Sequence, residues 1–578
     1  MRDVFSIAIF SVALIAFKCD ADAQTKPQLH PPLDIPLVLS GNFGEIRTNH
    51  FHSGLDFLTQ GREGLKVYAA LGGYVSRVKV SAYGYGKALY IAHPDGYTTV
   101  YAHLSSYYPE LDEWIKSEQY RLQRFEVDLY PEKDGFPITI GQVVGLSGNT
   151  GGSSGPHLHF EVRDSATEHA LNVLEFGLKI ADTRAPDIKG IKIYCLSDTS
   201  IVDGLDQDLY IPVEKVGGGY MLKHSGPVKV SGPVAFGINT TDKLDAAENV
   251  CGIYRIELTR DEEVIFSQKI DRVNFNLKKH MNAHVDYREQ RKNNRDIHRS
   301  FVRPGNKLAI YAGVKNKGVV HLQGEEKADF RFRVWDVAGN ESMLQFQIAN
   351  EPDKKMPPHS HLSAYREGAL SEPFSWKQEN HWQTEDCNVY LPKGALFDDV
   401  IFTYRESAAQ KGALTPTHEI GDTYEPLSED FTVKIRIPDD FEGDKSKLII
   451  VRHDPHNGKQ TAIKSTVSDG FLQAESSYFG WFFISEDKSK PVIRSVDFVQ
   501  NMKGRKTFSF KISDDLSGIS YFRFFIDGNW ALMDRDAKND KFTYTFSEKY
   551  LNKGSHKLRI AVIDVSGNDA EYTSDFEW

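Results

Sequence analysis

The chain has 578 residues, a formal net charge of −11 and 40% apolar residues. At roughly 150 residues per domain, this length predicts three to five domains with enough apolar side chains for packed cores. The net acidic charge and the lack of a long basic run argue against a nucleic-acid partner. The sequence therefore indicates a multidomain globular protein.

Residues 1–23 have the pattern of an export signal. Arg2 precedes an apolar run over residues 4–17, which is too short for a comfortable membrane span. Residues 21–23 fit an A-x-A cleavage site, so the mature chain is expected to begin at Gln24. A retained anchor, or a lipoprotein processed at Cys19, is the alternative. No later apolar stretch is long enough to span a bilayer, so we expect an exported protein without a transmembrane segment.

Short alternating runs over residues 41–102, bounded by Gly, Pro or Asp, predict an antiparallel sheet. One helix interrupts it: Pro109 suits a helix start, and Leu111, Ile115 and Leu122 follow at helical spacing. This helix is expected to be either a wall of a groove or an ordinary surface helix. Residues 138–145 return to a strand pattern.

The most informative stretch is residues 147–163, SGNTGGSSGPHLHFEVR, a glycine-rich turn followed by a strand-like run. In a strand, His157 and His159 point to one face, while Leu158 and Phe160 point to the core. Two neutral imidazoles on one face are typical of a zinc site, or of a zinc ligand beside a proton-transferring base.

Two upstream segments offer further polar groups. His52 and Asp56 are four residues apart and would share a face if their segment is extended. Strand alternation likewise places Tyr101 and His103 on one face, with Tyr101 either lining the groove or packing in the core. His50 is an alternative ligand to His52, and the spacing to Asp56 favours His52. A common groove is therefore expected where these segments meet.

The motifs HSGLD, YAHL and GPHLHFEVR, in this order, resemble the lysostaphin-type (LytM-like) zinc metallopeptidases over residues 42–163. The resemblance implies that His52, Asp56 and His159 bind one zinc ion, which would lower the pKa of a bound water. It implies that His103 and His157 handle protons and polarise the scissile carbonyl. Either histidine can act first. The substrates implied are peptide cross-links or stem peptides of bacterial peptidoglycan.

The rest of the chain repeats one pattern. The run from Asp336 to Asn340, DVAGN, recurs as DVSGN from Asp564 to Asn568. We predict five segments: a signal peptide (1–23), the peptidase domain (24–185), an immunoglobulin-like β-sandwich with an insertion (186–351), an additional β module (352–488) and a second sandwich (489–578). The insertion, residues 278–303, is rich in Lys, Arg and His and is expected to be a solvated loop or helix face rather than a surface for wall polymers.

Two smaller features remain. The H-x-H pair at His359 and His361 lies in a proline-rich stretch and is interpreted as linker. After signal cleavage the cysteines are Cys195, Cys251 and Cys387, an odd number. The first two fall in one predicted module and could pair in an oxidising envelope.

We therefore expect a mainly β, exported zinc metalloendopeptidase of the bacterial periplasm or cell envelope. One alternative is a catalytically idle wall-binding scaffold that activates another hydrolase. Another is a binding protein whose activity lies in the tail. Two similar sandwiches at separate places favour an extended arm, used for tethering to the wall or for docking an envelope protein.

Overall fold

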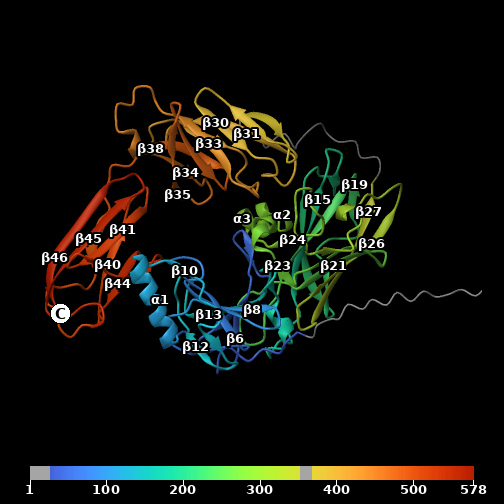
Figure 1. The fold of residues 1–578 in the computed structure, drawn as a ribbon. Helices are drawn as coiled ribbons and strands as arrows, with labels where there is room; N and C mark the ends of the chain where they lie inside the picture. Colours follow the sequence, from blue (N-terminus) through green and yellow to red (C-terminus); the bar gives the residue numbers. More distant parts are fainter. Residues whose placement is uncertain (1–25, 352–367) are drawn as a thin grey trace, which may run out of the picture.

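The computed structural model describes residues 26–351 and 368–578, and the predicted mainly β fold class is confirmed. The signal segment and the pair at His359 and His361 lie outside these residues. Four units follow one another in a ring (Figure 1), namely the N-terminal unit (β1–β14, 39–171), the second (β15–β27, 187–350), the third (β28–β38, 370–486) and the fourth (β39–β46, 492–577). None of the helices in the described part of the chain has the length and apolarity that a membrane crossing requires.

The main sheet of the N-terminal unit places the H-x-H strand at its centre. In β13 (His157–Asp164), His159 pairs with Asp56 of β4 (Leu55–Leu58) on one side and with Ala102 of β8 (Tyr97–Ala102) on the other. Phe160, on the opposite face, is fully buried. Pairing therefore brings three motifs that are distant in sequence to one place. The sheet order is β1 (Leu39–Gly41), β4, β13, β8, β7 (Lys87–Ala92), β6 (Gly73–Val80) and β10 (Val127–Leu129).

A smaller sheet and one helix complete this unit. The sheet joins β5 (Lys66–Tyr68), β12 (Val143–Leu146) and β9 (Ser106–Tyr107). The predicted helix is confirmed as α1 (Pro109–Leu122), which buries Leu111 and Ile115. Leu122, the third residue of the helical spacing, is the last residue of the helix and is 38% exposed, and the left-handed Gln123 follows it.

The second unit continues the first sheet, since β14 (Ala170–Leu171) pairs with β23 (Arg272–Val273). The prediction of a solvated insertion is wrong. Residues 278–303 include α2 (Met281–His284) and α3 (Tyr287–Asn293), and His284 is fully buried with its Nε2 3.1 Å from His298 Nδ1. Cys195 and Cys251, for which the sequence left a disulfide open, are both free thiols.

The third unit has a six-stranded and a five-stranded sheet that share one core around Phe402, Phe431 and Phe482. The fourth unit has two four-stranded sheets with a common aromatic core. Its strands include β39 (Val492–Ser495), β40 (Thr507–Ser513), β45 (Ser555–Asp564) and β46 (Asp569–Glu577). The immunoglobulin-like assignment of the repeated units stays a prediction.

The fourth unit folds back onto the N-terminal unit, so the expectation of an extended arm is wrong. Tyr120 of α1 stacks on Tyr550 with ring centroids 3.9 Å apart, and Lys549 pairs with Glu113. Elsewhere in the ring, α3 contacts the third unit through Arg291 and Asp454, 2.7 Å apart. Figure 1 shows the fourth unit lying beside α1. The N-terminal unit is therefore contacted by both the second and the fourth unit.

Candidate metal centre and active site

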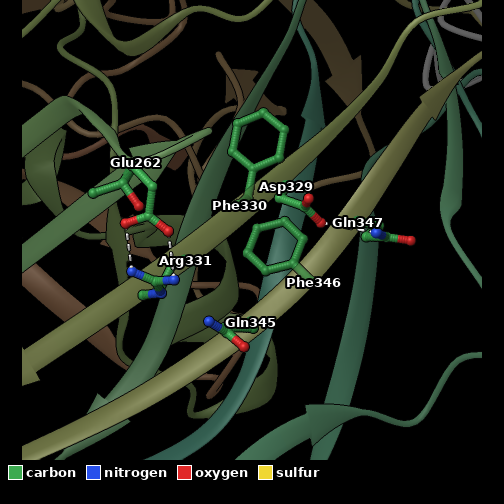
Figure 2. A pocket seen from close by; sticks show the side chains of 8 residues that line it. Glu262, Asp329, Phe330, Arg331, Gln345, Phe346 and Gln347 are labelled. Carbon is green, nitrogen blue, oxygen red and sulfur yellow. Dashed lines mark hydrogen bonds and ion pairs between the residues drawn. The ribbon is translucent and has the colours of Figure 1, made fainter.

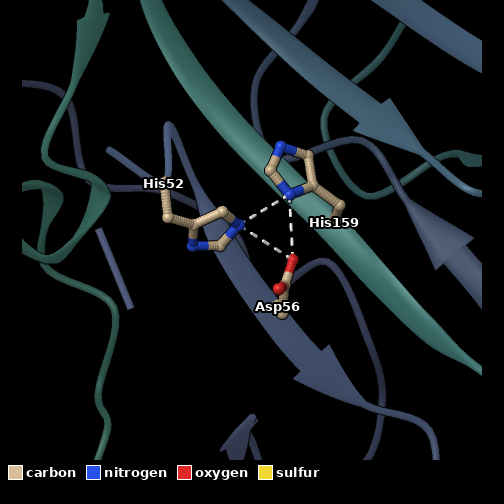
Figure 3. A group of neighbouring side chains, drawn as sticks. All are labelled: His52, Asp56 and His159. Atoms are coloured by element: carbon tan, nitrogen blue, oxygen red, sulfur yellow. Dashed lines mark hydrogen bonds and ion pairs between the residues drawn. The ribbon is translucent and has the colours of Figure 1, made fainter. Parts of the chain in front are cut away.

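Three side chains meet above the centre of the main sheet (Figure 3). Asp56 Oδ1 lies 3.1 Å from His52 Nε2 and 2.9 Å from His159 Nδ1. The two ring nitrogens are 3.1 Å apart. All three residues are at most 6% exposed. One carboxylate oxygen and two imidazole nitrogens thus face a single point.

His52 reaches this point by a route that strand alternation did not predict. β3 (His50–Phe51) ends before His52 and β4 begins only at Leu55, with a bend at Gly54, so residues 52–54 do not belong to a strand. The His52 ring is held instead by its Nδ1, which donates to the Asn42 carbonyl at 2.8 Å. His50, the alternative ligand, is exposed and contacts the Thr48 carbonyl.

His103 and His157 border the same point. The His103 ring lies 4.7 Å from the His157 ring and 5.9 Å from the His159 ring. His157 Nε2 is 3.4 Å from Asp56 Oδ1. The structure therefore brings together all five residues singled out in the sequence, although the individual roles assigned to them stay predictions.

The expectation that Tyr101 and His103 share a face is wrong. Tyr101 is fully buried, packs on Phe160 and accepts a hydrogen bond from the Ala70 amide. His103 follows the end of β8 with a φ of 58°, a left-handed conformation that is uncommon for a residue with a Cβ. This turn of the backbone moves His103 to the face of His157 and His159 and leaves Tyr101 in the core.

Each of the four imidazoles contacts a fixed acceptor through one ring nitrogen. The acceptors are the carbonyls of Asn42, Thr150 and Gly155, each 2.8 Å from an Nδ1, and the Glu161 carboxylate, 2.9 Å from His159 Nε2. An imidazole that donates one N–H in this way presents a lone pair on its other nitrogen when neutral. The other nitrogens of all four rings therefore face the cluster as acceptors or ligands.

Glu161 is the main residue of the site that the sequence motifs did not reveal. It is fully buried and accepts hydrogen bonds from Ser53 Oγ at 2.6 Å, from Tyr85 and from Arg163 Nε at 2.6 Å, besides His159. Alternation along β13 contained the signal, since Glu161 follows His157 and His159 on the same face. A second missed contact is Arg47 Nη2, 3.1 Å from Asp56 Oδ2, which leaves Oδ1 for the cluster.

Electrostatics at the cluster favour a bound positive charge. Burial opposes ionisation of Asp56, but His52 and hydrogen bonds from His157 and His159 hold its pKa well below the usual range. Burial disfavours protonation of His159, yet hydrogen bonds to Asp56 and Glu161 raise its pKa to about 9. A cation can replace the proton that His159 holds toward Asp56, since metal binding at such groups releases protons.

The donor set also fits zinc by geometry. Tetrahedral zinc with bonds of about 2.0–2.1 Å separates its ligand atoms by roughly 3.3 Å. The three observed separations are 2.9, 3.1 and 3.1 Å. Two imidazoles and one carboxylate are a usual catalytic zinc set, and they leave a position for water or substrate. His52, Asp56 and His159 are thus suited to hold the ion.

His103 differs from His159 because no carboxylate in the described part of the chain contacts it. Burial, with the neighbouring His159 and His157, lowers the pKa of His103 to about 3. The ring is therefore neutral at neutral pH and accepts a proton only when the reaction supplies one.

The glycine-rich turn beside the cluster is held by the fourth unit. Lys538 donates to the carbonyl of Asn149, to Asn149 Oδ1 at 3.0 Å and to the Ser153 carbonyl at 2.8 Å. Ser153 Oγ in turn lies 3.0 Å from His157 Nδ1. A residue from the far end of the chain thus fixes the turn that precedes the H-x-H strand.

A hollow on the second unit is a different kind of feature (Figure 2). It has a volume of about 400 Å³ and is lined by residues of β26 (Lys327–Trp335) and β27 (Glu341–Asn350), such as Phe330 and Phe346. Its charged groups are paired, Arg331 with Glu262 and Asp329 with Gln347. None of the five cluster residues lines it, so this hollow is not part of the active site.

Three known families match successive segments of the chain, which fall in the N-terminal, third and fourth units. Residues 50–120 match Peptidase family M23, residues 371–487 match a Zu5-like domain, and residues 485–577 match a domain of unknown function (DUF7743). The first match contains His52, Asp56 and His103, while His157 and His159 lie beyond it in β13. The resemblance drawn from the sequence motifs is confirmed for this part of the chain.

Individual relatives agree with the family match. The DD-carboxypeptidase/endopeptidase Mpg of Neisseria meningitidis serogroup B is 31% identical over 118 residues, 20% of this chain and 21% of the relative. A zinc containing peptidase from Vibrio cholerae is 27% identical over 24% of this chain and 34% of its own, with a TM-score of 0.16. The catalytic domain of lysostaphin from Staphylococcus simulans is 26% identical over 23% of this chain and 87% of its own, with a TM-score of 0.17. The chain covers only about a fifth of the curated relative.

We expect Glu161→Gln to weaken zinc binding by about 10–100-fold, because a neutral amide no longer raises the basicity of His159. Glu132→Gln, an exposed change of the same kind, should leave the affinity unchanged. Competition with a chromogenic zinc chelator measures both. Because Glu161→Gln also deprives Arg163 of its carboxylate, circular dichroism and a melting curve without zinc must show a folded variant. Unchanged zinc affinity in a folded Glu161→Gln protein would contradict a role for this carboxylate.

We expect Lys538→Ala to loosen the glycine-rich turn. Losing the hydrogen bonds of an exposed ammonium costs about 1 kcal/mol, so amide exchange in residues 149–155 should accelerate roughly fivefold. Hydrogen exchange with mass spectrometry measures this in the full chain. Lys553→Ala, an exposed change in the same unit, is the control. Equal exchange in the two variants would show that Lys538 does not hold the turn.

Proposed function

Since residues 50–120 belong to an M23-type peptidase domain, we propose that this protein is an exported zinc metalloendopeptidase that hydrolyses peptide bonds of bacterial peptidoglycan. The bonds are those of cross-links or stem peptides, and the location is the periplasm or cell envelope. The proposal rests on one observation: the Asp56 carboxylate meets four imidazoles, those of His52, His103, His157 and His159, whose unanchored ring nitrogens face the same point.

His52, Asp56 and His159 would hold the zinc ion, which would supply a Lewis acid and lower the pKa of a water molecule at the site. The other two histidines move protons. His103 and His157 keep Nδ1 on backbone carbonyls, so each can take or give a proton at Nε2 without turning its ring. One accepts a proton from the attacking water and passes it to the leaving amine. The other histidine helps to stabilise the oxyanion.

The remaining units bind rather than cut in this proposal. They are suited to hold the wall or an envelope protein while the N-terminal unit acts, which raises the local enzyme concentration at the substrate. The alternative of an idle scaffold that activates another hydrolase is less well supported. Such a scaffold has no physical need for a carboxylate and four imidazoles, each imidazole anchored through one ring nitrogen with the other toward one site.

The direct test is mass spectrometry of peptidoglycan fragments released by the purified full-length mature protein with zinc. We expect new amino termini at a cross-link or within the stem peptide, and none after zinc is removed with a chelator and the chelator dialysed away. Release restored by zinc supports hydrolysis. If a zinc-loaded, folded protein releases no fragments but stimulates a second wall hydrolase, the scaffold alternative is correct.

The ligand assignment predicts that His52→Ala and Asp56→Ala bind little zinc, because each removes one of three protein ligands. His50→Ala is the matched control, since His50 belongs to the neighbouring H-x-H pair, is exposed, and points to the Thr48 carbonyl. Zinc per chain is measured by inductively coupled plasma mass spectrometry after gel filtration. Full zinc content in Asp56→Ala, or loss of zinc in His50→Ala, would contradict the assignment.

The division of roles predicts a different pattern for the other two histidines. His103→Ala and His157→Ala should retain zinc and lose cleavage by about 10²–10⁴-fold, the usual contribution of general acid–base catalysis. Zinc content and cleavage of a soluble muropeptide are measured on the same samples. Loss of zinc in His157→Ala with retention in His159→Ala would exchange the roles given to these two residues.

A further inference from the structure

Two groups of three aspartates lie outside the site described above. Asp182, Asp242 and Asp336 form the first group, in the second unit. The second group, in the fourth unit, is formed by Asp487, Asp514 and Asp564. In each group, one oxygen from every residue lies within 4.8 Å of the other two.

The two groups occupy equivalent places in the chain. Asp182 and Asp487 lie in the segments that enter the second and fourth units. Asp242 follows β20 (Val234–Thr241) and Asp514 follows β40, and each of these strands pairs with the first strand of its unit, β15 (Asp187–Cys195) or β39. The third aspartate opens the repeated D-V-x-G-N turn between β26 (Lys327–Trp335) and β27 (Glu341–Asn350), or between β45 and β46.

The asparagine of each repeated turn ties the entering segment to the group. Asn340 Nδ2 donates to Asp336 Oδ2 at 2.7 Å and to the Asp182 carbonyl at 3.2 Å. Asn568 Nδ2 donates to Asp564 Oδ2 at 2.8 Å and to the Asp487 carbonyl at 2.9 Å. The shared D-V-x-G-N motif therefore builds the same arrangement twice, in units of different length.

Each group also holds a buried carboxylate oxygen without a donor. Asp242 is 2% exposed, and its Oδ1 accepts no hydrogen bond. Asp514 Oδ1 is likewise buried and accepts none. Within residues 26–351 and 368–578, no Lys or Arg forms an ion pair with any of the six aspartates. Burying an ionised oxygen without a donor or a cation is costly, and two further carboxylates nearby increase that cost.

We propose that each group binds one hard divalent cation, and that this cation is calcium. Calcium takes six to eight oxygen ligands from carboxylates and carbonyls in flexible geometry, and tolerates sites assembled from separate loops. The groups contain no His or Cys, the ligands that favour zinc or copper. A calcium ion in each group ties the entering segment to the two turns of its unit. It thereby fixes how the second unit follows the N-terminal unit and how the fourth follows the third.

The first group is also connected to the peptidase site by a short path. Asp242 and Cys251 exchange two backbone hydrogen bonds, of 3.0 and 2.8 Å. The next residue, Gly252, exchanges two more with the Asn42 side chain, at 2.7 and 2.9 Å. The carbonyl of Asn42 accepts the Nδ1–H of His52. A cation at Asp242 thus stiffens the segment that supports one of the zinc-facing histidines.

The test is isothermal titration of calcium chloride into the full-length protein, with one equivalent of zinc present to fill the histidine site. At calcium concentrations up to about 1 mM, the range of extracellular calcium modules, we expect about two ions per chain. Asp242→Asn and Asp514→Asn should each reduce this to about one, and the double variant should bind none. Asp198→Asn, an exposed change in the second unit, should still bind two.

The wild-type melting temperature gives a second readout that needs no variant. It should rise on adding calcium, because the ion binds the folded chain alone. Absence of both heat and a melting shift in the wild type would overturn the proposal. So would two bound ions in folded Asp242→Asn or Asp514→Asn, or binding of magnesium without binding of calcium. Circular dichroism excludes loss of binding through misfolding. If a variant is misfolded, Asp336→Asn and Asp564→Asn replace it as probes of the two groups.

Discussion

The site depends on one constraint: each of four imidazoles contacts a fixed acceptor through one ring nitrogen, so the other nitrogen can face the centre. Three of these acceptors are backbone carbonyls and the fourth is the buried Glu161. Because the carbonyls belong to residues 42, 150 and 155, the arrangement requires the folded N-terminal unit as a whole. A free histidine would lose rotamer entropy and choose between tautomers each time it bound a metal. Here that cost is met during folding.

The second and fourth units support two of the segments that provide these acceptors. The second unit supports Asn42 through Gly252, and Asn42 orients His52. The fourth unit supports the glycine-rich turn through Lys538, and that turn provides the contacts of His157 and His103. The ring arrangement of the four units therefore supports the residues that orient the histidines of the site. The segments that orient the histidines are contacted from both sides by parts of the chain far away in sequence.

The backbone departs from regular strand geometry at residues of the candidate active site. His103 adopts a left-handed backbone directly after β8, and His52 lies outside the strands, between β3 and β4. Regular alternation would direct His103 to the side of Tyr101, into the core. Strain of this kind persists only where the surrounding structure holds it, here the hydrogen bond from His103 Nδ1 to Thr150 and the pairing of β8 with β13.

The sequence alone determined the mainly β class, the helix that begins at Pro109 and the five residues that gather at the site, because period-two patterns and ordered His and Asp motifs are local properties of the chain. Glu161 was also within reach, since it continues the alternation of His157 and His159. Only the tertiary structure decided the contacts of Arg47, the burial of the insertion histidines, the free state of Cys195 and Cys251, and the return of the fourth unit onto α1. These depend on segments up to several hundred residues apart, whose meeting is set by the packing of whole sheets and leaves no periodic signal in either segment.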